Sequence, residues 1–218
     1  MRLLICFALL LFSGSGLSAK VTLNDPTSRA GFISLLLINE APFPGEHSYL
    51  SVNDTRTGML QILWVLHNRI ERIPRGYQQR HIATVSTNDI IDVITAGGTR
   101  GQVDGFYRDP RGIPTAVPRV HERVAYLTRI GNTGPPGKFA ALLNYAKELG
   151  EAYANAGPDG PDIFRDLMWV DRIRATGSAF SWMTDAPHYS PGGNYLRIPP
   201  SNRGVLAGNQ FFTLRAPQ

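Results

Sequence analysis

Residues 32–40 read FISLLLINE, and residues 59–70 read MLQILWVLHNRI. Both stretches are too apolar for helices with one face in water, so we expect two buried helices at the centre of the core. The segment between them, residues 42–55, is rich in turn-forming Pro, Gly, Ser, Asn and Asp, which predicts an ordered surface loop. The fold is therefore expected to be organised around two buried helices and one loop, and this loop begins beside Glu40.

The first buried helix is predicted to end next to this acidic residue. Asp25 followed by Pro26 is typical of a helix start. The prolines that follow Ala41 prevent the helix from continuing, so we expect a helix of about 15 residues that ends near Ala41. Glu40 then lies in the last turn.

Glu40 shares a helix face with residues that the helix has to bury. Those at helical spacing from it are Ile33, Leu36 and Leu37. A carboxyl group on such a face is partly desolvated, which raises its pKa and suits a general acid near neutral pH. Glu40 is therefore the candidate catalytic residue. The alternative is a side chain that turns into solvent or forms an ion pair with Arg69 or Arg72.

The first 19 residues have the pattern of a cleavable secretory signal. Arg2 precedes an apolar stretch at residues 3–12 that is too short for a stable membrane anchor, and small residues lead to Ala19. The single cysteine, Cys6, lies inside the apolar stretch, so the mature chain from Lys20 is expected to have none. Disulfides and thiol catalysis are then excluded, and we expect a periplasmic or secreted protein.

Residues 20–218 suit one domain with a sizeable core. The whole chain has a formal net charge of +5, and removal of Arg2 with the signal leaves about +4; this mild basic excess serves solubility first, and it would also suit an anionic polymer such as cell wall. Lys and Arg are scattered, without an interleaved aromatic stripe, so a nucleic-acid partner is not expected. The histidines lack ligand spacing, so no metal is expected. No other cofactor is expected either. Their positions are 47, 67, 81, 121 and 188.

The rest of the chain predicts further helices and a small β structure. Helices are expected at residues 88–95 with Thr87 as the N-cap, 119–130, 139–149 and 163–170. A loop or short strand is expected at residues 101–107, an irregular exposed loop at 187–202, and β-forming segments at 177–183 and 205–214. The β-forming segments could pair as a hairpin. The fold class is therefore mainly α with a small β-hairpin, an α+β domain.

Four short stretches of the sequence, taken in their order along the chain, carry a resemblance to a known family. They are NEA at 39–41 with NRI at 68–70, DIIDVI at 89–94 with GQ at 101–102, GSAFSW at 177–182, and AGNQFF at 207–212. In this order they resemble the cell-wall hydrolase family of spore-cortex-lytic type. The chain departs from the family in the longer interval between Glu40 and Asn68, in residues 108–160, and at Gln210, where the family has His.

The resemblance implies a lysozyme-like, mostly helical fold with Glu40 as the acid at a helix end. It also implies lytic cleavage of peptidoglycan glycan strands, in which one Glu acts as general acid and then as base. A hydrolase would add a second carboxylate about 5–9.5 Å away. The candidates are Glu46, Asp54 and Asp104, although acids in polar loops are usually just solvated.

Sugar binding requires aromatic faces and amides. The candidates are Tyr49, Gln102, Tyr107, Phe180, Trp182 and Asn209, and each aromatic could instead belong to the core. The expected partner is the peptidoglycan glycan strand, with an inhibitor or immunity protein as a further partner if the chain is a toxin; a monomer is expected. The alternatives are a non-catalytic peptidoglycan-binding or structural envelope protein, and a metal-dependent amidase.

Overall fold

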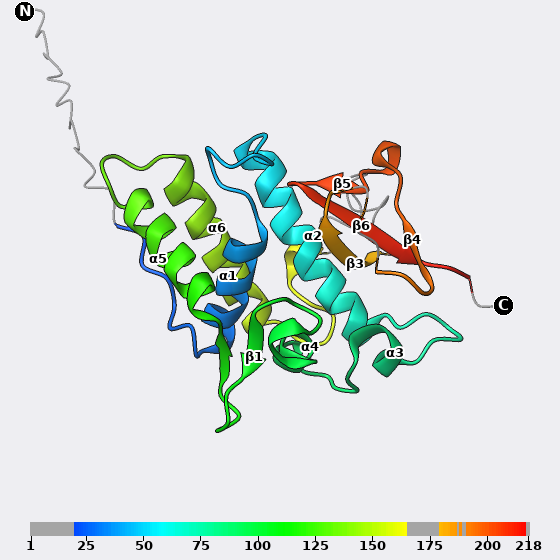
Figure 1. Ribbon diagram of the computed structural model, residues 1–218. Helices are drawn as coiled ribbons and strands as arrows, with labels where there is room; N and C mark the ends of the chain where they lie inside the picture. Colours follow the sequence, from blue (N-terminus) through cyan, green and yellow to red (C-terminus); the bar gives the residue numbers. More distant parts are fainter. Residues whose placement is uncertain (1–19, 165–178, 187, 189–190, 217–218) are drawn as a thin grey trace, which may run out of the picture.

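The computed structural model describes residues 20–164, 179–186, 188 and 191–216, and it confirms an α+β fold (Figure 1). The helices are α1 (Arg29–Glu40), α2 (Val52–Glu71), α3 (Gln79–Ala83), α4 (Ile90–Thr95), α5 (Pro118–Gly131) and α6 (Lys138–Ala154), with 3-10 turns η1 (Gly98–Arg100) and η2 (Pro200–Asn202). The strands are β1 (Phe106–Arg108), β2 (Pro114–Ala116), β3 (Ala179–Thr184), β4 (Tyr195–Arg197), β5 (Val205–Leu206) and β6 (Asn209–Leu214). The expected helix at 163–170 lies almost entirely outside the described residues.

Helix α1 ends at Glu40 as expected but begins later than the sequence suggested. Its N-cap is Ser28, whose Oγ accepts a hydrogen bond from the Gly31 amide at 3.0 Å. The prediction of Asp25 as the cap is wrong: its carboxylate accepts from the Thr27 amide at 2.8 Å in the preceding turn. Both residues are good caps. The helix therefore has 12 residues rather than about 15.

Helix α2 starts inside the segment that was expected to be a loop. Ser51 is its N-cap and accepts from the Asp54 amide at 3.0 Å, so the loop ends before residue 52 and not at 55. Asn53 and Asp54, which resemble loop residues in the sequence, occupy the first turn, where an acid is favourable. Likewise, α4 is capped by Asp89, which accepts from the Ile91 amide at 3.0 Å, and not by Thr87.

Helix α2 runs through the centre of the molecule, between a layer of helices and a β-sheet (Figure 1). On one side α1 packs against α5 and α6, and on the other the sheet lies against α2. Helix α6 approaches α1 closely because Gly150 has no side chain: a Cβ there would lie 2.3 Å from Ser34 Oγ. Residues from both layers belong to one hydrophobic cluster.

The C-terminal β structure is larger than the expected hairpin. Strands β3 and β6 do pair antiparallel, but β4 and β5 add to β6 and make a four-stranded sheet. The segment 187–202 is therefore not wholly irregular or exposed, since it contains β4 and the buried Ile198, whose amide donates to Phe211 O at 3.0 Å. Proline and glycine flank this short strand and hide it in the sequence. Strands β1 and β2 form a separate two-stranded sheet.

Among the described residues, no helix is long and apolar enough to cross a membrane.

Candidate active site

Glu40 is the last residue of α1, and its carboxylate is held by two donors. Trp182 Nε1 donates to Oε2 at 3.0 Å, and Asn39 Nδ2 donates to Oε1 at 3.0 Å. The side chain keeps partial exposure to solvent. Neither proposed ion-pair partner binds it: Arg69 donates to other groups, and the Arg72 guanidinium lies 4.7 Å from the centre of the Trp64 ring.

The surroundings raise the pKa of Glu40 above its ordinary value, and burial is the main cause. The hydrogen bonds from Trp182 and Asn39 favour the ionised form and lower the pKa, but by less than burial raises it. The negative charge of Asp104 also raises the pKa, and the positive charge of Arg123 lowers it. Glu40 therefore retains its proton to a higher pH than an ordinary glutamate does.

The carboxyl of Glu40 faces a cavity of about 340 Å³. The segment after η1 and the end of β3 form the other walls. Its lining residues are Glu40, Gly101, Gln102, Val103, Asp104, Trp182, Met183 and Thr184. Three segments that are far apart in the sequence thus meet around one titratable group, and the cavity is open to solvent beside it.

Arg69 of α2 forms hydrogen bonds to both β3 and the segment after η1, which form two of these walls. Its side chain is buried, with 3% of the residue exposed, and Nε donates to Phe180 O at 2.7 Å while Nη1 donates to Gln102 Oε1 at 2.8 Å. The guanidinium also lies 5.5 Å from the centre of the Trp182 ring. Gln102 in turn donates to Thr84 Oγ1. The positions of Trp182 and Gln102 therefore depend on one buried side chain of α2.

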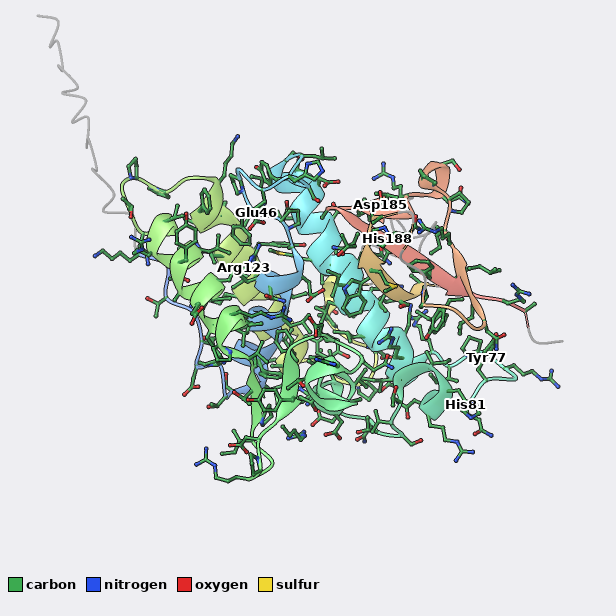
Figure 2. The ribbon with its side chains drawn as sticks, in the orientation of Figure 1. Glu46, Tyr77, His81, Arg123, Asp185 and His188 are labelled. Atoms are coloured by element: carbon green, nitrogen blue, oxygen red, sulfur yellow. The ribbon has the colours of Figure 1, made fainter. Side chains whose placement is uncertain are left out.

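Asn209 and Arg123 hold the end of α1, where helix carbonyls lack partners within the helix. Asn209 Nδ2 donates to Glu40 O at 3.1 Å. Arg123 donates to Ile38 O and to Ala41 O, and its Nη2 lies 2.7 Å from Glu46 Oε1. Figure 2 shows Arg123 and Glu46 on the helical side of the molecule. These contacts hold the backbone at the C-terminal end of α1, where Glu40 is the last residue.

The sugar-binding candidates divide into two groups. Gln102 and Trp182 line the cavity, and the side-chain amide of Asn209 donates to the backbone carbonyl of Glu40. The others do not line it. Phe180 is in the core with 4% exposure, Tyr49 packs against the core, and Tyr107 of β1 pairs with Thr115 of β2. Their aromatic rings serve packing or lie elsewhere on the surface.

The three candidates for a second carboxylate also separate. Asp104 lines the same cavity as Glu40; it forms an ion pair with Arg119 and keeps 68% of its side chain exposed. Glu46 binds Arg123 and the Phe43 amide. Asp54 accepts from the Ala207 amide at 3.0 Å, and burial raises its pKa. Only Asp104 of the three shares the cavity, while the other two connect loops to the helices.

Sequence reasoning missed Asn39, Met183 and Thr184 as site residues and treated Arg69 only as an ion-pair partner. Asn39 and Arg69 both lie within the stretches that carry the family resemblance, so their presence there was a usable signal. Met183 and Thr184 had no signal, because only the course of β3 takes them to the cavity wall.

Within the described ranges, no group of three or more His, Cys, Asp and Glu residues could hold a metal ion. One histidine is in the core, where His67 Nδ1 lies 3.2 Å from the Tyr153 hydroxyl. Comparison of the chain with protein-family models, with curated proteins and with solved structures finds no match.

Proposed function

We propose that this chain is an exported enzyme that cleaves the glycan strands of peptidoglycan as a lytic transglycosylase, on a lysozyme-like fold. The bond cleaved is the one between N-acetylmuramic acid and N-acetylglucosamine, and Glu40 is the general acid and base. One observation carries the proposal: a glutamate at a helix end, whose pKa is raised by burial and whose carboxylate accepts two hydrogen bonds, faces a solvent-accessible cavity.

In the first step, protonated Glu40 gives its proton to the glycosidic oxygen while the bond from that oxygen to C1 of the muramic acid breaks. The Glu40 carboxylate left behind accepts hydrogen bonds from Trp182 and Asn39, which stabilise its charge. In the second step, the 6-hydroxyl of the same sugar attacks C1 and gives its proton to Glu40. The acid is restored, no water is consumed, and the product has a 1,6-anhydro end.

A muramidase is the second candidate, because Asp104 lines the same cavity. Its carboxylate would activate a water or attack C1, which is the usual part of a second acid in glycoside hydrolysis. Asp104 forms an ion pair with Arg119, and a substrate would have to compete with that partner. The lytic reaction requires only the carboxyl of Glu40, whose pKa is raised mainly by burial, so we place it first.

The product mass separates these reactions. Purified peptidoglycan is digested with the chain from Lys20 onward, with and without a chelator, and the fragments are weighed by mass spectrometry. We expect glycan fragments about one water lighter than reducing-end products, because the attacking hydroxyl belongs to the substrate. Reducing-end fragments would identify a muramidase, and released peptides with chelator-sensitive activity would identify an amidase. Binding to the wall without any fragments would leave a binding or structural protein.

Trp182→Phe tests the role of the indole N–H. The substitution removes the hydrogen bond to Glu40 Oε2, which favours the ionised carboxylate, so the pKa of Glu40 should rise further. Activity that needs protonated Glu40 falls as pH rises through this pKa. We therefore expect that fall to move to higher pH by about one unit, and turnover to decrease about tenfold.

The matched control for Trp182→Phe is Met183→Leu. Met183 lines the same cavity and lies in the same strand, and leucine has a volume similar to that of methionine. The pH profile of Met183→Leu should coincide with that of the wild type. An unchanged alkaline limb in Trp182→Phe would show that Glu40 is not the titrating acid.

A further inference from the structure

A second cavity, of about 690 Å³, lies between α3, the loop before β4 and the end of β6. Tyr77, His81, Asn194, Tyr195 and Arg215 are among its lining residues. Figure 2 shows Tyr77 and His81 at the end of the molecule away from Arg123 and Glu46. None of its lining residues belongs to the Glu40 cavity.

The two tyrosines have their hydroxyls fixed by backbone carbonyls. Tyr77 donates to Arg215 O at 2.7 Å, and Tyr195 donates to Ile82 O at 3.3 Å. The hydrogen bond from Tyr77 holds the C-terminal segment against the loop before α3. These two hydrogen bonds connect the walls of the cavity, and a ligand can bind without breaking them.

Three polar side chains on the walls are available to a ligand. Within the described part of the chain, the side chains of His81, Asn194 and Arg215 have no hydrogen-bond or ion-pair partner, and all three residues are exposed. The Arg215 guanidinium and the Asn194 amide supply N–H donors, and the His81 imidazole supplies a further one. The cavity therefore offers donors to an acceptor-rich ligand.

The two stretches of sequence that form this cavity are basic, and Arg215 lines it. Both segments that form it lack acidic residues over long stretches, 72–88 and 186–218. The same stretches contain Arg72, Arg75, Arg80, Arg197, Arg203 and Arg215. A cavity with such walls concentrates anions, and a guanidinium fork binds a carboxylate with two parallel hydrogen bonds.

The two cavities are connected through the end of α3. Ile82 O accepts the Tyr195 hydroxyl on the side of the second cavity, and two residues later Thr84 Oγ1 accepts from Gln102 of the Glu40 cavity. The two cavities are thus neighbours on either side of residues 82–84, and a polymer that extends from Glu40 past this segment would reach the second cavity. The ligand of the second cavity is then expected to be a substituent of the same polymer.

We propose that the cavity between α3 and the end of β6 binds the carboxylates of the peptide stems of peptidoglycan, so that the enzyme selects peptide-substituted strands. This inference rests on the proposed function. The tyrosine rings pack against the aliphatic parts of the stem, and Arg215 binds a carboxylate. A glycan strand without stems lacks this anchor.

Binding of a free stem tetrapeptide, which contains no glycosidic bond, tests the site directly. The peptide is titrated into the chain from Lys20 onward and followed by calorimetry. Arg215→Gln should weaken binding at least about tenfold, because a charge-assisted hydrogen bond is lost. Tyr77 binds only the backbone of residue 215, so the fold should be kept. Arg129→Gln, which removes the same charge from α5, should bind like the wild type.

Several outcomes would overturn the inference. They are no peptide binding by the wild-type chain, equal binding by Arg215→Gln, and equal binding of a peptide whose carboxyl groups are all amidated. Tighter binding of a phosphate polymer than of the peptide, abolished in Arg215→Gln, would assign the cavity to a different anion and equally reject it.

Cleavage assays separate a failure of this inference from a failure of the proposed function. The wild type should cleave stem-bearing strands with a lower KM than strands stripped of peptides, and Arg215→Gln should lose this preference while its rate on stripped strands is unchanged. Equal cleavage of both strands by the wild type would reject the stem site and leave the Glu40 chemistry intact. Specific peptide binding without cleavage of either strand would reject the chemistry alone.

Discussion

Replacement of Glu40 by glutamine is expected to reduce the turnover of peptidoglycan glycan strands about 10³-fold or more. The amide keeps the shape of the side chain and can still accept the hydrogen bond from Trp182, but it cannot give a proton to the leaving oxygen. Since the same group would perform both proton transfers, no second residue compensates for the loss. The rate of fragment release, measured at saturating substrate, gives the effect.

Binding and stability distinguish this loss from misfolding. Glu40→Gln should bind purified peptidoglycan like the wild type and unfold at a similar temperature. Because the pKa of Glu40 is raised in the folded state, the folded chain holds this proton more tightly than the unfolded chain. Wild-type stability contributed by this group is therefore present at low pH and is lost as pH rises through the folded pKa. The glutamine variant should lack that part of the pH dependence.

The matched control is Glu46→Gln, the same change in a nearby glutamate that braces Arg123 and does not line the Glu40 cavity. It should keep most of the wild-type turnover. Turnover near the wild-type level in Glu40→Gln, or an equal loss in both variants, would contradict the assignment of Glu40.

Arg69→Met is expected to lower the free energy of unfolding by about 2–3 kcal/mol. The methionine fills similar space but leaves Phe180 O and Gln102 Oε1 without their donor, and the Trp182 ring loses its cation. Removal of a buried charge offsets part of this cost. Because Trp182 and Gln102 then lose their support, turnover should also fall, by about 10²-fold.

Denaturant unfolding and fragment release measure the two effects of Arg69→Met. Arg75→Met is the control, since Arg75 is exposed and does not line the Glu40 cavity. It should change neither quantity. Wild-type stability in Arg69→Met would show that the buried contacts of Arg69 do not stabilise the fold.

The end of α1 and the burial of both central helices could be predicted from sequence because each depends on neighbours along the chain. Apolar spacing and the prolines after Ala41 act within a few residues, and they correctly place Glu40 in the last turn on a face that is partly buried. The start of α1 could not be predicted in the same way, because the local sequence offers two possible N-caps. Asp25 and Ser28 are both suitable caps, and only packing of the chain before α1 selects Ser28.

Packing at Gly31, in the first turn of α1, also constrains where the helix starts. A Cβ at this position would lie 1.9 Å from Asp25 O, so the preceding turn crosses the helix where there is no side chain. The hydrophobic periodicity of a sequence does not reveal where one segment crosses a helix. Strand β4 is a comparable case, since three residues between prolines and glycines become a strand only because β6 offers an open edge.

The environment of Glu40 depends on contacts across the chain, and those only the tertiary structure decided. Trp182 is 142 positions from Glu40, yet its N–H holds the carboxylate, and Asn209 reaches the carbonyl of Glu40 across 169 positions. The same folding separated Asp104, which shares the cavity, from Glu46 and Asp54, which brace loops. The sequence by itself determined that a glutamate ends a buried helix, because helix periodicity is local. Which groups surround that glutamate is set by long-range packing, and no spacing of residues records it.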